Sequence, residues 1–232
     1  SLELKKSKST VAFIPVGATE QHGRHLPMGS DLIQAEIISE KIAAEFNAYL
    51  TPAMPFGTSI EQMQGIGSLT LSYKTLASVI KDLADSLART GFKEIFVLSY
   101  HGGNFILPIA VRDINYRRSD VKVYYLNPWD LAVESINFEN AAGPDFVSDV
   151  HSGPRETSLM LYIASDLVQM KNARDTNPKH RITDLNHIDM VSATEGVGSW
   201  GKATKAKKEI GKIIFEAMVN KSIERVRELL GG

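Results

Sequence analysis

The chain has 232 residues, of which 43% are hydrophobic and 23% charged, so it is long enough to bury one sizeable core, and we expect a single domain over residues 1–232. Its 26 Lys and Arg residues nearly balance 27 Asp and Glu residues, and the net charge of -1 gives no basic excess for a nucleic acid polymer or a membrane surface. The absence of Cys excludes disulfides and thiolate zinc sites. Because we find neither an export signal nor an apolar run of membrane-spanning length, we expect a cytoplasmic protein that binds a small molecule.

Two sequence patterns alternate along the chain. Short apolar runs that stop at Pro or Gly are typical of buried strands, and apolar residues that recur every three or four positions are typical of helices with one buried face. We predict strands at residues 11–14, 48–54, 93–100 and 121–126, and helices at 32–46, from 76 to near 91, at 106–118, after 158 through 163, and from about 204 to 230. This alternation predicts an α/β fold, a three-layer α/β/α sandwich with a mostly parallel central sheet.

The remaining stretches give weaker patterns. Residues 1–10 are polar and Lys-rich, so we expect a frayed lead-in. Glycines and prolines interrupt residues 56–70, which predicts a mobile loop over the site, and residues 137–150 are also loop-like. Residues 172–201 are polar and broken, with a short strand expected near 187–191.

The loop between the first predicted strand and the first predicted helix is rich in metal-binding side chains. Glu20 and His22 stand two residues apart, so in an extended loop their side chains would point the same way and converge on one ion. Asp31, at the start of the helix, could bind metal through its two oxygens. His101 ends a different predicted strand at the same edge of the sheet, and it is the candidate for a fourth ligand. Zinc and manganese accept this set of oxygen and nitrogen ligands.

Each of these residues also has a simpler explanation. Asp31 alone would most simply cap the helix, and a single His after a strand is more often a hydrogen-bonded structural residue than a ligand. His25 could orient a metal ligand, contact the substrate or serve a structural role. The coincidence of Glu20, His22, Asp31 and His101 at strand ends favours the metal site.

A set of ordered motifs extends from Val11 to the last predicted helix. The motif residues are Thr19, Glu20, Gln21, His22 and Gly23, then His25, Leu26 and Pro27, Asp31, His101, Gly102, Gly103 and Asn104, and finally His151, Gly153, Glu156, Thr157 and Ser158. Together they resemble the creatininase (creatinine amidohydrolase) family. The resemblance implies a metal-dependent amidohydrolase with a three-layer α/β/α fold that often forms homo-oligomers, namely hexamers.

The resemblance also implies a site for one or two divalent ions, zinc or manganese, with iron as the alternative. Glu20 and His101 would serve one ion and His22 the other, and Asp31 would bridge them. Such a pair of ions suits amide hydrolysis, because it can activate water and polarise a carbonyl group. Gly102, Gly103, Asn104 and His25 are then candidates for contact with the substrate or with the metal ligands.

Two further residues have implied roles. His151 resembles the general acid or base of the family, which would pass a proton from water to the leaving nitrogen, since an unperturbed imidazole titrates near pH ~6.5. Its simpler explanation is a polar residue that precedes a helix. Glu156 would complete the shell of the second ion or hold His151 in orientation. Alternatively, Glu156 is an ordinary acidic residue that the helix dipole favours in a first turn.

Two positions depart from the family pattern and bear on the substrate. Gly103 stands where creatininase carries a Glu metal ligand, so we expect one ion to be weaker, differently ligated or absent. Val147 stands where creatininase has a Trp that closes over creatinine, and Trp129 and Trp200 are the residues that could substitute for it. We therefore expect a small amide substrate other than creatinine itself, such as a related cyclic amide or a formamide. The resemblance also implies formamidopyrimidine nucleotides and peptides as candidates, because the family includes enzymes that act on amide bonds in both.

Two other classes of protein compete with this hypothesis. Gly102 and Gly103, between a predicted strand and a helix, could approach a phosphate in a nucleotide-binding module, but the chain lacks both G-x-G-x-x-G after its first strand and G-x-x-x-x-G-K-[ST]. The other competitor is a metal-binding family member without catalytic activity, in which metal would stabilise the fold and His151 would be dispensable.

Overall fold

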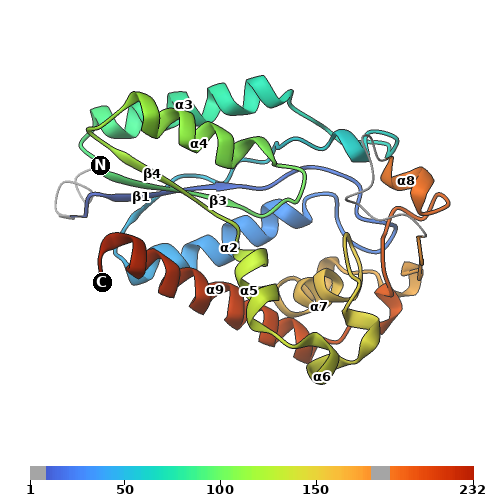
Figure 1. Cartoon of the computed structure of the whole chain (residues 1–232). Coiled ribbons are helices and arrows are strands. Elements are labelled where there is room, and N and C mark those ends of the chain that lie inside the picture. The colour runs from blue at the N-terminus through green and yellow to red at the C-terminus, as the bar shows by residue number, and fades with distance from the viewer. Residues whose placement is uncertain (1–8, 179–188) are drawn as a thin grey trace.

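The computed structural model describes residues 9–178 and 189–232. Within these residues the chain forms a four-stranded sheet in which every neighbouring pair of strands is parallel (Figure 1). The strand order is β2-β1-β3-β4, with β1 at Val11–Val16, β2 at Tyr49–Leu50, β3 at Glu94–Ser99 and β4 at Lys122–Leu126. The predicted parallel sheet is confirmed.

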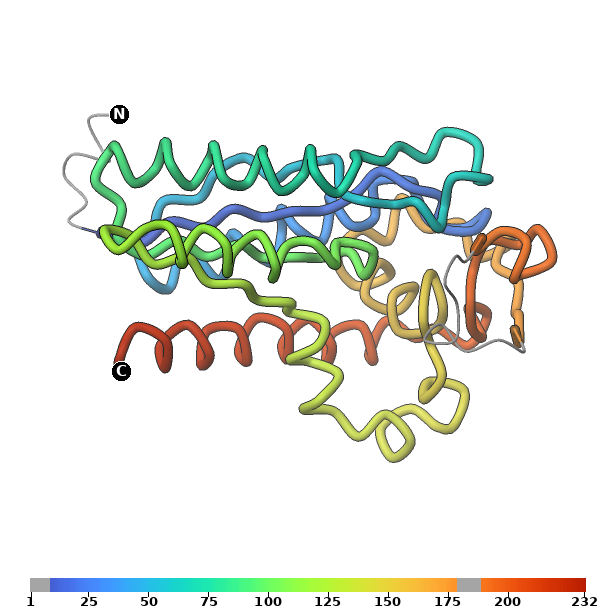
Figure 2. The backbone as a smooth tube through the Cα atoms, turned by 45° about the horizontal axis from the view of Figure 1, so that its top comes forward, coloured from blue at the N-terminus to red at the C-terminus, as the bar shows by residue number. Residues whose placement is uncertain are grey.

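Helices cover both faces of this sheet, as Figures 1 and 2 show. One face carries α3 (Tyr73–Arg89) and α4 (Ile106–Arg117). The other carries α2 (Ser30–Glu45), α5 (Pro128–Ser135) and α9 (Lys208–Leu230), and α7 (Pro154–Ile163) packs against α9. The predicted three-layer α/β/α sandwich is confirmed.

Shorter helices connect these elements. They are α6 (Phe138–Ala142), α8 (Met190–Ala193) and the 3₁₀ helices η1 (Ile60–Gln62), η2 (Pro144–Phe146), η3 (Ser165–Leu167), η4 (Met170–Asn172) and η6 (Ala203–Lys205). None of the helices in the described parts of the chain combines the length and the apolar character that crossing a membrane requires.

The central strands are buried on both faces, which explains their continuous apolar sequences. Phe13 of β1 stacks on Phe96 of β3, with ring centroids 5.2 Å apart, and both face the layer of α2 and α9. Their neighbours Ile14 and Val97 point to the opposite face and pack against α3 and α4. Burial of side chains of this size stabilises the fold by about 1.5–3 kcal/mol each. The two cores hold β1 and β3 side by side, so the loops that follow these strands leave the same edge of the sheet.

The predicted second strand is much shorter than expected. Residues 48–54 were predicted to form it, but only Tyr49 and Leu50 pair as β2. The chain continues beside β1, where the amides of Thr51 and Met54 donate to the carbonyls of Phe13 and Pro15 at 3.0 and 2.9 Å. Pro52 between them has no N–H to donate, which interrupts the ladder.

Other predictions were wrong at the level of single elements. The segment 137–150 is not only a loop, because it contains α6 and η2. The last helix begins at Lys208, since η6 occupies the residues just before it. In the strand expected near 187–191, residues 187 and 188 lie outside the described residues and Met190 begins α8, so that expectation fails for the described part. Most of the expected lead-in, residues 1–8, also lies outside the described residues.

Candidate metal centre

The loop after β1 and the loop after β3 bring the predicted metal ligands together. Glu20 and His22 lie in the first loop, Asp31 lies in the first turn of α2, and His101 stands two residues after the end of β3. Gly17 permits this arrangement, because a Cβ at that position would lie 2.8 Å from the backbone of Leu32. The loop can therefore pass close to the start of α2, and all four side chains are buried.

Glu20, Asp31 and His101 form the first cluster, which we call cluster A. One ligand atom from each of the three residues lies within 4.8 Å of the others. Nδ1 of His101 is 3.3 Å from Oδ2 of Asp31, and Nε2 of His101 is 3.2 Å from Oε2 of Glu20. Asp31 does not cap its helix, because Gly29 holds the N-cap position and no side chain caps there. The simple capping explanation for Asp31 is therefore wrong.

His22, Asp31 and Glu156 form the second cluster, which we call cluster B, and their ligand atoms also lie within 4.8 Å of one another. Nε2 of His22 is 3.4 Å from Oδ1 of Asp31 and 3.2 Å from Oε1 of Glu156. Asp31 thus presents one oxygen to each cluster. This arrangement of donors is compatible with two metal ions that share one carboxylate.

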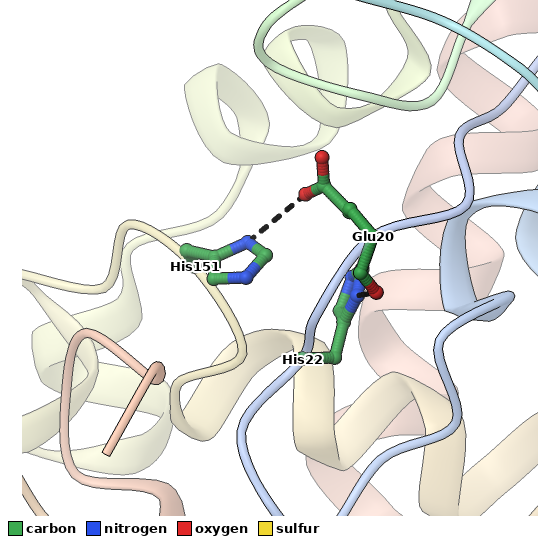
Figure 3. A group of neighbouring side chains, drawn as sticks. All are labelled: Glu20, His22 and His151. Carbon is green, nitrogen blue, oxygen red and sulfur yellow. Dashed lines mark hydrogen bonds and ion pairs between the residues drawn. The ribbon is translucent and has the colours of Figure 1, made fainter. Parts of the chain in front are cut away.

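His151 lies at the edge of both clusters. Its ring faces the carboxylate of Glu20, and Nδ1 is 3.5 Å from Oε1 of Glu20 (Figure 3). The centroids of the His151 and His22 rings are 4.6 Å apart, and Glu20, His22 and His151 meet the same 4.8 Å limit. His151, to which the family resemblance gives the role of general acid or base, therefore lies beside the candidate ligands.

Backbone carbonyls accept hydrogen bonds from one nitrogen of each of these His rings. Nδ1 of His22 lies 3.1 Å from the carbonyl oxygen of Glu20, Nε2 of His101 lies 2.9 Å from that of Thr58, and Nε2 of His151 lies 2.8 Å from that of Gln21. In the neutral form each ring donates through that nitrogen, and its other nitrogen keeps a lone pair directed at the carboxylates. Metal-binding His residues commonly have this arrangement.

Three buried carboxylate oxygens of these clusters, two on Glu20 and one on Asp31, lack a hydrogen-bonding partner among the described residues. Among the described residues, no donor completes a hydrogen bond to either oxygen of Glu20 or to Oδ2 of Asp31, although His nitrogens lie 3.2–3.5 Å away. A buried charge without compensation destabilises the folded protein by roughly several kcal/mol, so we expect a cation as the partner of these oxygens. The set of oxygen and imidazole donors, with no sulfur, fits zinc or manganese.

The charges in the clusters perturb the pKa values. Burial raises the pKa of Glu20 to about 7, although His101 opposes the rise. Burial disfavours the charged form of His101, but the carboxylates of Glu20 and Asp31 outweigh it and raise its pKa to about 10. The pKa of Asp31 is well below its ordinary range, because His22 and His101 outweigh the effect of burial. Without metal, protons on the imidazoles compensate these carboxylates, and bound cations would replace those protons.

Glu156 is fixed by residues that the sequence analysis did not identify as functional. Its Oε2 accepts from the backbone amide of Ser152 at 2.8 Å, and its Oε1 accepts from Nε2 of Gln34 at 2.9 Å. The indole N–H of Trp129 in turn donates to Oε1 of Gln34 at 2.8 Å. Gln34 stands three residues after Asp31 on α2, so helical spacing from a predicted ligand was the signal that could have identified it.

The other predicted residues lie around the clusters rather than in them. Nε2 of His25 is 2.8 Å from Oγ1 of Thr157, and burial lowers the pKa of His25 to about 4. Asn104 is buried, and its Oδ1 accepts from the amide of Thr58 at 2.9 Å, so it holds the loop after β2 against the loop after β3. Gly103 lies at the same contact between the two loops, where its carbonyl oxygen accepts from the hydroxyl of Thr58.

A cavity of about 300 Å³ opens beside the clusters. Asp31, His101, His151 and Glu156 contribute to its lining, together with Gly102 and Trp129. Of the two tryptophans that could replace the missing aromatic at Val147, only Trp129 lines this cavity. Trp200 is buried elsewhere, and its amide donates to the carbonyl of His151 at 2.7 Å.

Comparison with known proteins agrees with this geometry. The family model described as "Creatininase: Creatinine amidohydrolase" matches residues 1–226. The chain belongs to the creatininase family. A solved structure titled "Creatininase Mn" is 28% identical to this creatininase-family chain, with a TM-score of 0.84 over 98% of this chain and 93% of that one. Another, a creatininase mutant described as "Zn-Zn type", is 25% identical with a TM-score of 0.80 over 96% and 98% of the two chains.

The relatives of this creatininase-family chain carry different names. Creatinine amidohydrolase of Pseudomonas putida is 29% identical, covering 94% of this chain and 89% of the relative. Mycofactocin precursor peptide peptidase of Mycolicibacterium smegmatis is 26% identical, covering 94% and 84%. The 3-dehydro-scyllo-inosose hydrolase of Thermotoga maritima is 25% identical, covering 94% and 77%. The three names share hydrolysis but not the substrate.

Proposed function

We propose that this protein is a metal-dependent amidohydrolase that cleaves a carbon-nitrogen amide bond in a small molecule. The observation that carries the proposal is Asp31, which presents one buried oxygen to cluster A and the other to cluster B, beside a cavity of about 300 Å³. Two of the named relatives, an amidohydrolase and a peptidase, support an amide substrate. The name of the inosose hydrolase mentions no amide, so the identity of the bond must be tested.

Zinc or manganese fits the two clusters, and iron is the alternative. Glu20 and His101 would hold one ion and His22 and Glu156 the other, with Asp31 shared between them. When bound, divalent ions supply a water molecule of lowered pKa and a positive charge that polarises a carbonyl group. Trp129 tethers Gln34, and Gln34 tethers Glu156, so this ligand is held in place before metal or substrate arrives.

His151 would carry the proton. Burial and the neighbouring His22 lower the pKa of His151 to about 4, so its ring is neutral at pH 7. The carbonyl of Gln21 holds the proton on Nε2, which leaves the lone pair on Nδ1 at the edge of the cavity. We propose that Nδ1 accepts a proton from the attacking water and returns it to the leaving nitrogen. Glu20, 3.5 Å away, can stabilise the imidazolium that forms in between.

The nucleotide-binding alternative receives little support. A phosphate site at Gly102 and Gly103 would need backbone amides that face open space. The space at Gly103 is occupied, because a Cβ there would lie 2.2 Å from a carboxylate oxygen of Glu61. A negative charge at this position would repel a phosphate.

Hydrolysis can be tested with the metal removed and restored. Chelation should abolish cleavage across a panel of creatinine, related cyclic amides, formamides and short peptides, and Mn²⁺ or Zn²⁺ should restore it for one substrate class. His151→Ala should lower kcat by about 10²–10⁴-fold while the protein still binds metal. If metal raises the melting temperature but no member of the panel is cleaved, and His151→Ala changes nothing measurable, the protein is a metal-binding family member without this activity.

A further inference from the structure

A carboxylate from a separate loop lies beside the ring of His101. Glu61 belongs to η1, in the loop between β2 and α3, and Figure 1 shows this loop at the end of the sheet to which β1 and β3 lead. Oε1 of Glu61 is 3.5 Å from Nε2 of His101. The Glu61 side chain is 23% exposed, so it reaches inward from the rim of the site and is not simply an acidic residue on the surface.

Gly103 provides the space for this contact. A Cβ at position 103 would lie 2.2 Å from Oε1 of Glu61 and 2.4 Å from Nε2 of His101. Such distances are far inside van der Waals contact, so any residue other than glycine would push the carboxylate and the imidazole apart. The absence of a side chain at Gly103 therefore allows the carboxylate of Glu61 to approach the ring of His101.

Four oxygens lie around the same nitrogen of His101. Besides Glu61, the carbonyl oxygen of Thr58 lies 2.9 Å, Oε2 of Glu20 lies 3.2 Å and the hydroxyl oxygen of Ser59 lies 3.4 Å from Nε2. Oxygens on this side favour a proton on Nε2, which leaves the lone pair of Nδ1 directed at Asp31, 3.3 Å away. Carboxylates that accept from the far nitrogen of a ligand His fix its tautomer and orientation and strengthen it as a metal ligand.

We propose that Glu61 is a positioning residue that holds His101 in the tautomer needed for metal binding and so strengthens cluster A relative to cluster B. Gly103 has no side chain and so places no charge beside His101. Glu61 supplies a negative charge there from a different loop. The inference rests on the metal site of the proposed function. It adds to that site a residue that is distant in sequence from every predicted ligand.

Metal titration without substrate tests this inference. Chelator-treated wild type and Glu61→Gln are titrated with Mn²⁺ by calorimetry. Glu61→Gln keeps the shape of the side chain and removes its charge, so one ion should bind about 10–100-fold more weakly while the other binds as in wild type. Glu40→Gln is the matched control, because it removes the same charge from an exposed position on α2. Glu61→Asp keeps the charge and should recover part of the affinity.

The hydrogen bond of the His101 Nε2–H gives a second, independent readout. Without metal His101 carries protons on both nitrogens at neutral pH, because its pKa is raised to about 10, so the measurement uses Zn²⁺-loaded, His-labelled protein. The chain has 6 His residues, whose ¹⁵N signals can be assigned by single substitutions. Glu61→Gln should shift the ¹⁵N and ¹H signals of the His101 Nε2–H, because the neighbouring carboxylate is lost, whereas Glu40→Gln should not. A role in loop structure alone would not produce this change.

The outcomes separate the two proposals. If wild type binds two ions and Glu61→Gln binds both with unchanged affinity, or if the signals of the His101 Nε2–H do not change, the inference about Glu61 is overturned and the metal site remains. If wild type binds no Mn²⁺ or Zn²⁺, the proposed function fails and this inference fails with it. Should Glu61→Gln not fold, as judged by its melting curve, Glu61→Ala also removes the charge and provides the same comparison.

Discussion

Gly103→Ala should destabilise the protein through a collision that the loops cannot relieve. The new Cβ would lie 2.3 Å from the carbonyl oxygen of Thr58, in addition to its collisions with Glu61 and His101. Glu61 can swing toward solvent, since the atom concerned is the end of a flexible side chain. Thr58 cannot move in the same way, because its amide donates to Asn104 at 2.9 Å and its hydroxyl donates to the carbonyl of Gly103 at 2.6 Å.

The size of the effect follows from this difference. Overpacking of a closely fitted site costs about 1–3 kcal/mol. In a chain of this length each kcal/mol lowers the melting temperature by about 2–4 °C, so the expected loss is about 2–12 °C. Metal affinity should fall as well, because the collision displaces the ring of His101.

Thermal melts of the metal-free protein provide the measurement, and the neighbouring glycine provides the control. A Cβ at Gly102 would meet no atom within 4 Å, so Gly102→Ala should change stability by less than about 0.5 kcal/mol. Equal melting temperatures for Gly103→Ala and Gly102→Ala would refute the reasoning, because the close packing of Gly103 against Thr58 and His101 would then have no energetic consequence.

Two further predictions concern the surroundings of the clusters. Gln34→Leu removes the hydrogen-bonding partner of both Glu156 and Trp129. It should lower the free energy of unfolding in denaturant by about 1–3 kcal/mol and weaken the binding of one Mn²⁺ more than the other. Equal weakening of both ions would contradict the assignment of Gln34 to Glu156. Burial lowers the pKa of His25 to about 4 in the folded protein. His25 therefore binds a proton more tightly in the unfolded chain, where its pKa is about 6.5. The stability that neutral His25 contributes is present above pH ~6.5 and is lost as pH falls toward 4. Between pH 7.5 and 4.5 His25→Gln should therefore lose less unfolding free energy than wild type, by up to about 3 kcal/mol, and identical losses would contradict the burial of a neutral His25.

The sequence was sufficient for the sheet and for the proximity of the main candidate ligands. β1 and β3 were predictable because burial on both faces requires continuous apolar runs. Once these strands are neighbours in a parallel sheet, the residues that follow them meet at one edge, which brings Glu20, Asp31 and His101 together. The position of His151 came from the family resemblance rather than from spacing.

Other features depend on tertiary contacts that no local pattern reports. Glu61 stands in a Gly-rich loop without helical or strand periodicity, and its approach to His101 depends on how that loop folds against Gly103. The start of helix α5, by contrast, has a local sequence signal. Pro128 occupies its first turn and Asn127 accepts from the amide of Trp129 at 3.0 Å, which is a typical helix start. Trp129 reaches Gln34 and the cavity from this helix.

The most direct test of the account is the number of ions that depend on Asp31. Wild type, Asp31→Asn, Glu156→Gln and the exposed control Asp82→Asn on α3 are stripped with chelator, titrated with Mn²⁺ and analysed for bound metal. The account predicts two ions per chain for wild type and Asp82→Asn, weaker binding of both ions for Asp31→Asn, and weaker binding of only one for Glu156→Gln. Full binding of two ions by Asp31→Asn, or the weakening of only one, would contradict the central claim that a single buried carboxylate serves both clusters.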